Sequence, residues 1–598
     1  MKNRTAISMA WGIVLILSAG RAFGAEAPVP AKVAITRVWP AKIVYKPGET
    51  AKITVDLENK TKDALTASVS LAINYGLVAR DELPAQSASL PAGGKATVTF
   101  AYPVPKGRKW GHAVMALVKA AGGETLAQGR EFFAVGNNPW EVGHYITMFG
   151  LRGWKQNGRI DNGLLPSFRA GYITTIEGYS WQPSVFDEMT PDTETWRSGQ
   201  GGYKEGKQDW IYLISQAHAQ GMAVVTYIQG ASYGPAGVDF ARRHPAWMTL
   251  DKNGRPSAFF DVDKLTAWRE DPESQPFDTP VGGFLGNFLP GNQVVGDYWI
   301  DELIRSVEMF GWDGFRSDGA PGVIEGYDYQ GKLHEVKDPG EANAAYLRKV
   351  RARLTQRFPN FIYGWNNVVG GYPKTLCSAA EEDVMLPGAY SLYENFNSAS
   401  QPSCPFHPWK KAAYYLQNEA APIREHGGFP HAGWMWSLRY VEAVASASGM
   451  QVDQIQPWPV QPLLRNYARF EFRWSEFLWD NQLRYVRPGG QAVKVEGPAQ
   501  VWWQDFVHAR DLPDGRQRVI VHLLNMPAND DEAWADRPPA PATNVRVRFT
   551  VPPNKKLARL VAFSPDGTED VIPATPDAKG ALALPEVKLW TVVVAEFK

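Results

Sequence analysis

A short polar segment near the middle of the chain contains the residues best suited to chemistry. Residues 311–319 read Gly-Trp-Asp-Gly-Phe-Arg-Ser-Asp-Gly and include Asp313, Arg316 and Asp318. Side chains alternate along a strand, so Arg316 and Asp318 should share one face if the segment is extended. A neighbouring guanidinium group favours the ionised form of a carboxyl group. Asp318 is therefore the candidate nucleophile, and Arg316 and Asp313 are candidate supporting residues.

Glu394 is the candidate for a second catalytic carboxyl group. Hydrolysis of a glycoside needs one carboxyl group at the anomeric carbon and another that protonates the leaving oxygen. Glu394 ends an extended stretch at residues 390–394. Five other acids compete for the role: Glu177, Asp313, Glu381, Glu382 and Asp383. They are less well placed, because Glu177 lies inside a predicted strand, Asp313 begins one, and the acids at 381–383 precede one.

Predicted strands and helices alternate around these acids. The expected strands are 145–149, 173–179, 223–229, 313–318, 361–366 and 390–394, and the expected helices include 209–220, 298–310 and 467–480. This order predicts a (β/α)8 TIM barrel over residues 140–488, with its last two strands unresolved between residues 426 and 454. Asp318 and Glu394 would lie at carboxyl ends of strands, where such barrels carry their chemistry.

Sequences on both sides of the barrel alternate with the period of a strand. Residues 30–136, with apolar residues at Ile53, Val55 and Leu57, predict an Ig-like β-sandwich. Residues 490–598, with strands expected at 518–524, 545–551 and 590–594, predict an antiparallel β-sandwich domain. The expected fold is therefore multidomain, with a central TIM barrel between two β domains.

The first 25 residues predict a secretory signal peptide. Lys2 and Arg4 precede an apolar run at residues 6–19, and small residues follow it. No other stretch approaches 18 apolar residues, so the expected mature protein is periplasmic or extracellular and has no membrane anchor. In an oxidising compartment Cys377 and Cys404 could pair, although two buried thiols are equally consistent with the sequence.

The composition favours an uncharged partner and argues against cofactors. Lys plus Arg and Asp plus Glu number 62 each, which argues against a nucleic-acid partner. The 23 Trp residues suit the apolar faces of sugar rings, so a neutral polysaccharide or oligosaccharide is the expected substrate. The ten His have no metal-ligand spacing and no phosphate-binding glycine motif occurs, so neither a metal nor another cofactor is expected. The oligomeric state does not follow from the composition.

Polar and aromatic residues at or near the predicted strand ends are candidates for binding sugar. They are Tyr179, Trp181, Tyr227, Tyr233, Trp365, Asn366, Trp434 and Trp436. Some of these side chains should instead pack inside the barrel, and their burial distinguishes the two roles.

Several of these motifs resemble the dextranase family, glycoside hydrolase family 66, which includes cycloisomaltooligosaccharide glucanotransferases. Residues 179–182 resemble its Y-D-W-x motif, 226–234 its A-Y-x-x-x-Y-G stretch and 289–299 its N-P-x-N-x-x-W motif. Residues 312–318 resemble the family's F-D-G-x-x-x-D nucleophile strand, and Glu394 stands where the family has its catalytic acid. Residues 521–525 resemble the H-L-x-N strand of the family's C-terminal domain. The order of the three domains is similar as well.

This resemblance implies a retaining enzyme that cleaves an α-glucan, with Asp318 as nucleophile and Glu394 as acid/base. The implied substrate is a dextran-like α-1,6-glucan or a related neutral polysaccharide, and the implied reaction is hydrolysis or glycosyl transfer. Ser180 stands where the family has Asp, and Arg316 is unusual within the nucleophile motif. The chain is therefore expected to be a distant relative.

Two alternatives belong to other functional classes. Residues 230–234 match the G-x-S-x-G pattern of a serine esterase built on Ser232, with His334 or His431 as a possible partner. However, Pro235 follows the pattern where that motif needs a helix. The second alternative is a barrel that binds glycans without cleaving them.

Overall fold

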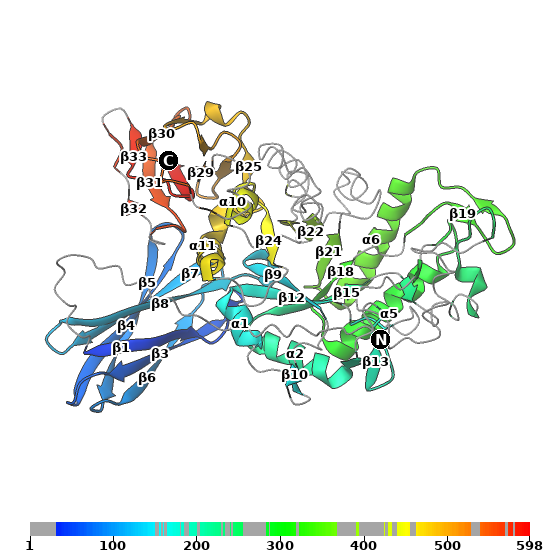
Figure 1. Ribbon diagram of the computed structural model, residues 1–598, viewed down its shortest axis with the longest axis horizontal. Coiled ribbons are helices and arrows are strands. Elements are labelled where there is room, and N and C mark those ends of the chain that lie inside the picture. Colours follow the sequence, from blue (N-terminus) through cyan, green and yellow to red (C-terminus); the bar gives the residue numbers. More distant parts are fainter. Residues whose placement is uncertain are drawn as a thin grey trace, which may run out of the picture.

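The computed structural model places an N-terminal β part, a central barrel and a C-terminal β part (Figure 1). It describes residues 32–149, 155–156, 159–160, 164–179, 181–183, 190–199, 204–228, 231–233, 240, 243–254, 283–285, 288–317, 322–366, 390–393, 424, 429–432, 439–454, 462–527, 537, 539–567, 572–573, 575–577 and 580–598. The predicted signal peptide and both cysteines lie outside these residues.

Eight parallel strands form a closed barrel in the order β12-β15-β18-β21-β22-β23-β24-β9. They are β9 (His144–Phe149), β12 (Ile173–Tyr179), β15 (Ala223–Ile228), β18 (Gly314–Ser317), β21 (Ile362–Asn366), β22 (Tyr390–Tyr393), β23 (Phe429–Ala432) and β24 (Gln451–Gln454). All six residues of β15 are buried, as expected for a parallel strand covered on both faces. The six predicted barrel strands are confirmed to within two residues at each end.

Helices follow six of the barrel strands within the described residues. They are α1 (Leu164–Ala170), α2 (Lys207–Ala219), α5 (Val294–Phe310), α6 (Pro339–Arg357), α10 (Arg439–Ala447) and α11 (Pro462–Leu478). In α5 the buried Trp299, Leu303 and Val307 recur at helical spacing. The helix ends at Gly311, whose φ of 83° is a left-handed conformation that glycine adopts readily. The chain reverses at Gly311 and enters β18 three residues later.

Short elements complete the barrel region. The strands form antiparallel pairs, namely β10 (Lys155–Gln156) with β11 (Arg159–Ile160), β13 (Thr195–Arg197) with β14 (Lys204–Gly206), β16 (Ala231–Tyr233) with β17 (Gly283–Leu285), and β19 (Gly326–Tyr327) with β20 (Leu333–His334). The 3-10 turns are η1 (Pro139–Glu141), η4 (Pro245–Trp247) and η6 (Gly489–Gln491).

Two sheets make up the N-terminal part. Their orders are β1-β3-β6 and β2-β8-β7-β4-β5, from β1 (Val33–Pro40), β2 (Val44–Tyr45), β3 (Thr50–Asn59), β4 (Leu65–Tyr75), β5 (Ala79–Leu90), β6 (Lys95–Pro103), β7 (Trp110–Ala120) and β8 (Thr125–Val135). Ile53, Val55 and Leu57 are fully buried and share one core with Val69 and Val114 from the facing sheet. The predicted alternation in β3 is therefore confirmed.

The C-terminal part contains a sheet that is buried on both faces. Its larger sheet runs β25-β28-β29-β34-β31-β32 with β27 beside β29, and a second sheet runs β26-β30-β33. The strands are β25 (Arg484–Tyr485), β26 (Val493–Glu496), β27 (Val501–Trp502), β28 (Val507–Asp511), β29 (Gln517–Asn525), β30 (Val545–Phe549), β31 (Leu557–Phe563), β32 (Ile572–Pro573), β33 (Ala581–Leu584) and β34 (Trp590–Phe597).

One face of the larger sheet packs on the smaller sheet, and the other face packs on α10 and α11. This double burial explains why all eight residues of β34 are enclosed. Helix α11 therefore belongs to the barrel and to the core of the C-terminal part at once.

Helix α11 also contacts the N-terminal part. A Cβ atom at Gly111 in β7 would lie 2.2 Å from the carbonyl oxygen of Phe472, so only glycine permits this approach. Arg473 Nη1 donates to Gly111 O at 3.1 Å. Helix α11 thus joins all three parts of the molecule (Figure 1). The domain boundaries drawn from the sequence stay predictions.

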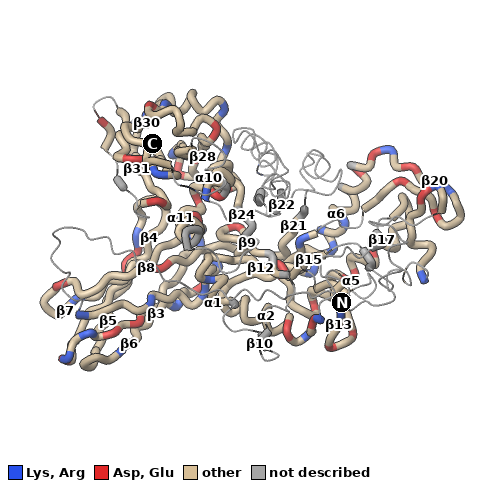
Figure 2. The backbone as a smooth tube through the Cα atoms, viewed as in Figure 1, with Lys and Arg blue, Asp and Glu red and all other residues tan. Residues whose placement is uncertain are grey.

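Residues of both charge signs are spread along the chain. Lys and Arg as well as Asp and Glu occur in the N-terminal part, the barrel and the C-terminal part (Figure 2). Among the described residues no helix is long and apolar enough to span a membrane.

Candidate active site in the barrel

The two predicted catalytic acids directly follow strands of the barrel. Asp318 comes after Ser317, the last residue of β18, and Glu394 comes after Tyr393, the last residue of β22. Only β21 lies between these strands in the barrel order. Both acids lie outside the described residues, as do Trp434 and Trp436 and the side chains of Tyr233, Trp365 and Asn366.

A buried ion pair lies inside the barrel just before the end of β18. Arg316 Nε lies 3.9 Å from Glu177 Oε1, and the two side chains are 2% and 0% exposed. Glu177 belongs to β12, and β15 separates that strand from β18. The two side chains can therefore meet only across the barrel interior. A charged pair in this position carries a large desolvation cost, which is common at functional sites.

Tyrosines surround this pair. The Tyr145 hydroxyl, from β9, donates a short hydrogen bond to Glu177 Oε2. Arg316 Cζ lies 5.2 Å from the ring centroid of Tyr227, a cation–π distance. The rings of Tyr179 and Tyr227 are 4.1 Å apart. We call Tyr145, Glu177, Tyr179, Tyr227 and Arg316 the barrel-interior cluster.

Two predicted sugar-binding residues are part of this cluster, and they differ in exposure. Tyr227 is 1% exposed, whereas Tyr179, the last residue of β12, is half-buried. Tyr179 is thus the one predicted subsite residue whose described side chain reaches a more open environment at a strand end.

Trp181 is enclosed in the structure. Its side chain is 0% exposed, and its Nε1 donates to the carbonyl oxygen of Tyr227 at 2.8 Å. The ring packs edge-on against Phe310 and at 5.2 Å from Trp312. An indole held this way contributes to the packing between barrel and helices and offers no face to a sugar.

Asp313 lies at the opposite end of β18 from Asp318. Its Oδ2 accepts hydrogen bonds of 2.7 Å from the backbone nitrogen of Val224 and from His218 Nε2. Asp313 immediately precedes β18, whose four residues rise about 13 Å, and its two hydrogen bonds hold the amino end of the strand in place. The hydrogen bond that His218 donates to Asp313 raises the pKa of His218.

Ser232 does not have the surroundings of a hydrolase nucleophile. It lies in the middle of β16 and pairs with Phe284 of β17. A nucleophile elbow requires the serine in a sharp turn between a strand and a helix. His334 is bonded to Asp328 at 2.9 Å, so this histidine already has an acidic partner of its own.

Sequence reasoning did not identify Tyr145 and treated Glu177 only as a competing acid. The signal was present, because Glu177 is the single charged residue of a buried strand and should face inward with Thr175. The sequence could not show that Glu177 pairs with Arg316, because Arg316 lies on a strand that is not adjacent to β12.

Comparison with known proteins identifies a similar fold. No family model matches the sequence, and no curated protein sequence matches it either. Among solved structures, a cycloisomaltooligosaccharide glucanotransferase of Paenibacillus sp., in complex with cycloisomaltoheptaose, aligns with a TM-score of 0.67 and 15% identity. The alignment covers 94% of this chain and 99% of that one. The two chains therefore share a fold over nearly their whole length.

Other solved structures align less closely. An α-amylase of Anoxybacillus has a TM-score of 0.42 and 9% identity, covering 76% of this chain and 98% of that one. An α-galactosidase of Lactobacillus brevis has a TM-score of 0.38 and 12% identity, covering 92% of this chain and 78% of that one. Overlaps this loose add nothing to the fold comparison.

Proposed function

We propose that this chain is a retaining glycoside hydrolase or transglycosidase that acts on an α-glucan. Asp318 is the proposed nucleophile and Glu394 the proposed acid/base. The observation that carries the proposal is that each acid directly follows a barrel strand, with one strand between them. Carboxyl ends of parallel strands meet at one rim, where two carboxyl groups can act on one glycosidic bond.

The likeness to the glucanotransferase supports this proposal independently. It spans nearly the whole of both chains, and the related protein was solved with a cyclic glucan. Together with the sequence motifs, this favours an α-1,6-linked glucan such as dextran and a distant membership of glycoside hydrolase family 66. The signal sequence favours action in the periplasm or outside the cell.

The barrel-interior cluster gives Arg316 a specific role in this mechanism. Its guanidinium is fixed below the rim by Glu177 and by the Tyr227 ring, two residues before Asp318. A fixed cation there favours the ionised form of Asp318, and a nucleophile must be ionised to attack. Glu177 and Tyr145 are positioning residues that hold the cation in place.

A panel of polysaccharides tests the proposed activity. Purified protein should release reducing sugar or cyclic product from at least one of dextran, starch and cyclic glucans. Asp318→Asn and Glu394→Gln should each lower kcat by about 10³ or more on that substrate. Asp313→Asn is the matched control, because it makes the same chemical change at the other end of β18.

The outcomes separate the alternatives. Equal losses for Asp318→Asn and Asp313→Asn would indicate damage to the strand and would remove the support for Asp318 as nucleophile. Absence of cleavage across the panel, with glucan binding retained, would identify a non-catalytic glycan-binding barrel instead.

A further inference from the structure

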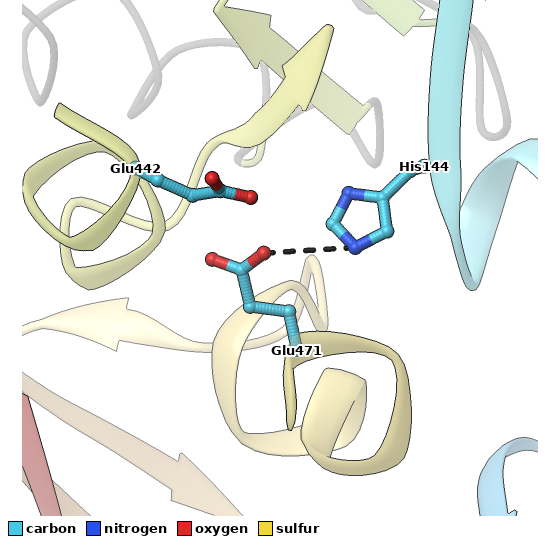
Figure 3. A group of neighbouring side chains, drawn as sticks. All are labelled: His144, Glu442 and Glu471. Atoms are coloured by element: carbon cyan, nitrogen blue, oxygen red, sulfur yellow. Dashed lines mark ion pairs between the residues drawn. The ribbon is translucent and has the colours of Figure 1, made fainter. Parts of the chain in front are cut away.

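Three buried ionisable side chains meet at the amino end of the barrel, away from the proposed active site. His144 is the first residue of β9, Glu442 lies in α10 and Glu471 lies in α11 (Figure 3). One nitrogen or oxygen atom from each lies within 4.8 Å of the others. The three residues are 0%, 4% and 0% exposed. We call this group the His–Glu–Glu cluster.

The hydrogen bonding of His144 leaves one ring nitrogen with a lone pair. Nε2 donates to the carbonyl oxygen of Ala468 at 3.1 Å, which puts the proton on Nε2. Nδ1 then has no hydrogen and no hydrogen-bond partner within the described part of the chain. Figure 3 shows this nitrogen on the side of the ring that faces the Glu442 carboxylate. Metal-binding histidines are commonly oriented by this kind of hydrogen bond to a carbonyl oxygen.

Within the described part of the chain, the carboxylate of Glu471 lies beside a serine hydroxyl and a histidine ring. Its Oε1 accepts a 2.6 Å hydrogen bond from Ser446 Oγ, and its Oε2 lies 3.6 Å from His144 Nε2. No Lys or Arg of the described segments forms an ion pair with it. Two adjacent buried carboxyl groups need either a shared proton or a cation, because two bare charges in this environment repel strongly.

We propose that His144, Glu442 and Glu471 bind one divalent transition-metal ion of the zinc type. Zinc accepts one imidazole nitrogen and two carboxylate oxygens as ligands, with bonds of about 2.0–2.2 Å. Tetrahedral ligands at that distance lie about 3.4 Å from one another, so ligand atoms that now lie within 4.8 Å would have to approach by up to about 1.4 Å to bind the ion. The ion neutralises both carboxylates and coordinates the bare Nδ1 of His144.

The location of the cluster assigns the ion a structural role. It would link the first barrel strand to α10 and α11, and these two helices form the core beneath the larger C-terminal sheet. Binding to the folded state alone raises stability, so the joint between barrel and C-terminal part should become harder to unfold. This role is independent of the proposed glycosidase activity.

Direct metal analysis tests the proposal. Full-length protein, produced in zinc-supplemented medium and then dialysed against metal-free buffer, should retain about one zinc ion per chain by mass spectrometry. A chelator should lower the melting temperature, and added Zn²⁺ alone should restore it. Glu442→Gln, which keeps the side-chain shape, should weaken zinc binding by at least about 100-fold, and His144→Gln should do the same.

The control variant is His334→Gln, which removes a partly exposed histidine bonded to Asp328 and should leave the bound zinc unchanged. If the cluster variants fail to fold, X-ray diffraction from a crystal of the wild-type protein at the zinc absorption edge still tests whether zinc is bound. An anomalous peak between the three side chains supports the site. The proposal is overturned if wild-type protein holds no stoichiometric Zn²⁺, Mn²⁺ or Co²⁺ and a chelator leaves its melting temperature unchanged. In that case a proton shared between Glu442 and Glu471 accounts for the two buried carboxyl groups.

Discussion

Replacing Arg316 with methionine should destabilise the barrel, because Glu177 would remain charged inside it. The two side chains are almost fully buried, and 3.9 Å separates their nearest charged atoms. Two unit charges at this distance attract by about 4 kcal/mol at an effective dielectric constant of about 20. Removing one partner of a buried pair costs about 3–5 kcal/mol, since the remaining charge has lost its counter-ion. We expect Arg316→Met to lose about 3 kcal/mol of barrel stability.

A double-mutant cycle isolates the contribution of the pair. Glu177→Gln should cost a similar amount, because it leaves the guanidinium buried in the same place. The double variant should be about 2–3 kcal/mol more stable than the sum of the single losses predicts, since it contains neither charge. Methionine and glutamine approximately keep the volumes, so cavities contribute little.

Differential scanning calorimetry is the appropriate assay, because a chain with several parts need not unfold in one step and the barrel transition must be followed separately. Single losses that add to within about 0.5 kcal/mol would show that the two side chains do not interact, and would refute the reasoning. Two further variants report activity: Arg316→Ala should lower kcat by about 10², and Arg316→Lys should recover only part of it.

Three further predictions address other sites. The hydrogen bond to Asp313 raises the pKa of His218 above 6.5, so this bond should stabilise the protein fully below pH 6.5. The stabilisation should be lost as the pH rises through the raised pKa of His218. The melting temperatures of wild type and His218→Gln should therefore differ more at pH 5.5 than at pH 8.5. Trp181→Ala should cost about 3–5 kcal/mol in denaturant unfolding, and Trp181→Phe should cost less, as expected of a packing residue rather than a subsite. Ser232→Ala should keep kcat within about twofold of wild type on any cleaved glucan, whereas an ester hydrolysis that this variant loses completely would support the esterase alternative.

The sequence predicted the barrel strands that contain a run of apolar residues. β15 is recognisable because both of its faces are covered and most of its residues are therefore apolar. The last two strands were not resolved, because β23 reads Phe-Pro-His-Ala and β24 reads Gln-Val-Asp-Gln. Neither has an apolar run or a clear alternation, and only pairing with neighbouring strands in the closed barrel makes them strands.

The sequence was less informative about what each side chain contacts. It placed Trp181 near a strand end, but the direction of the ring depends on Phe310 and Trp312, which come from a later helix and the turn after it. The His–Glu–Glu cluster brings His144 to two acids that lie about 300 positions later in the chain, so no local spacing could indicate it.

The anomeric configuration of the first product tests the proposed mechanism most directly. Proton NMR during the first minutes of cleavage of an α-glucan, before mutarotation, distinguishes the two anomers. A double displacement through Asp318 and Glu394 predicts that the new reducing end appears first as the α anomer. Initial formation of the β anomer would contradict the account, because it would require a single displacement by water.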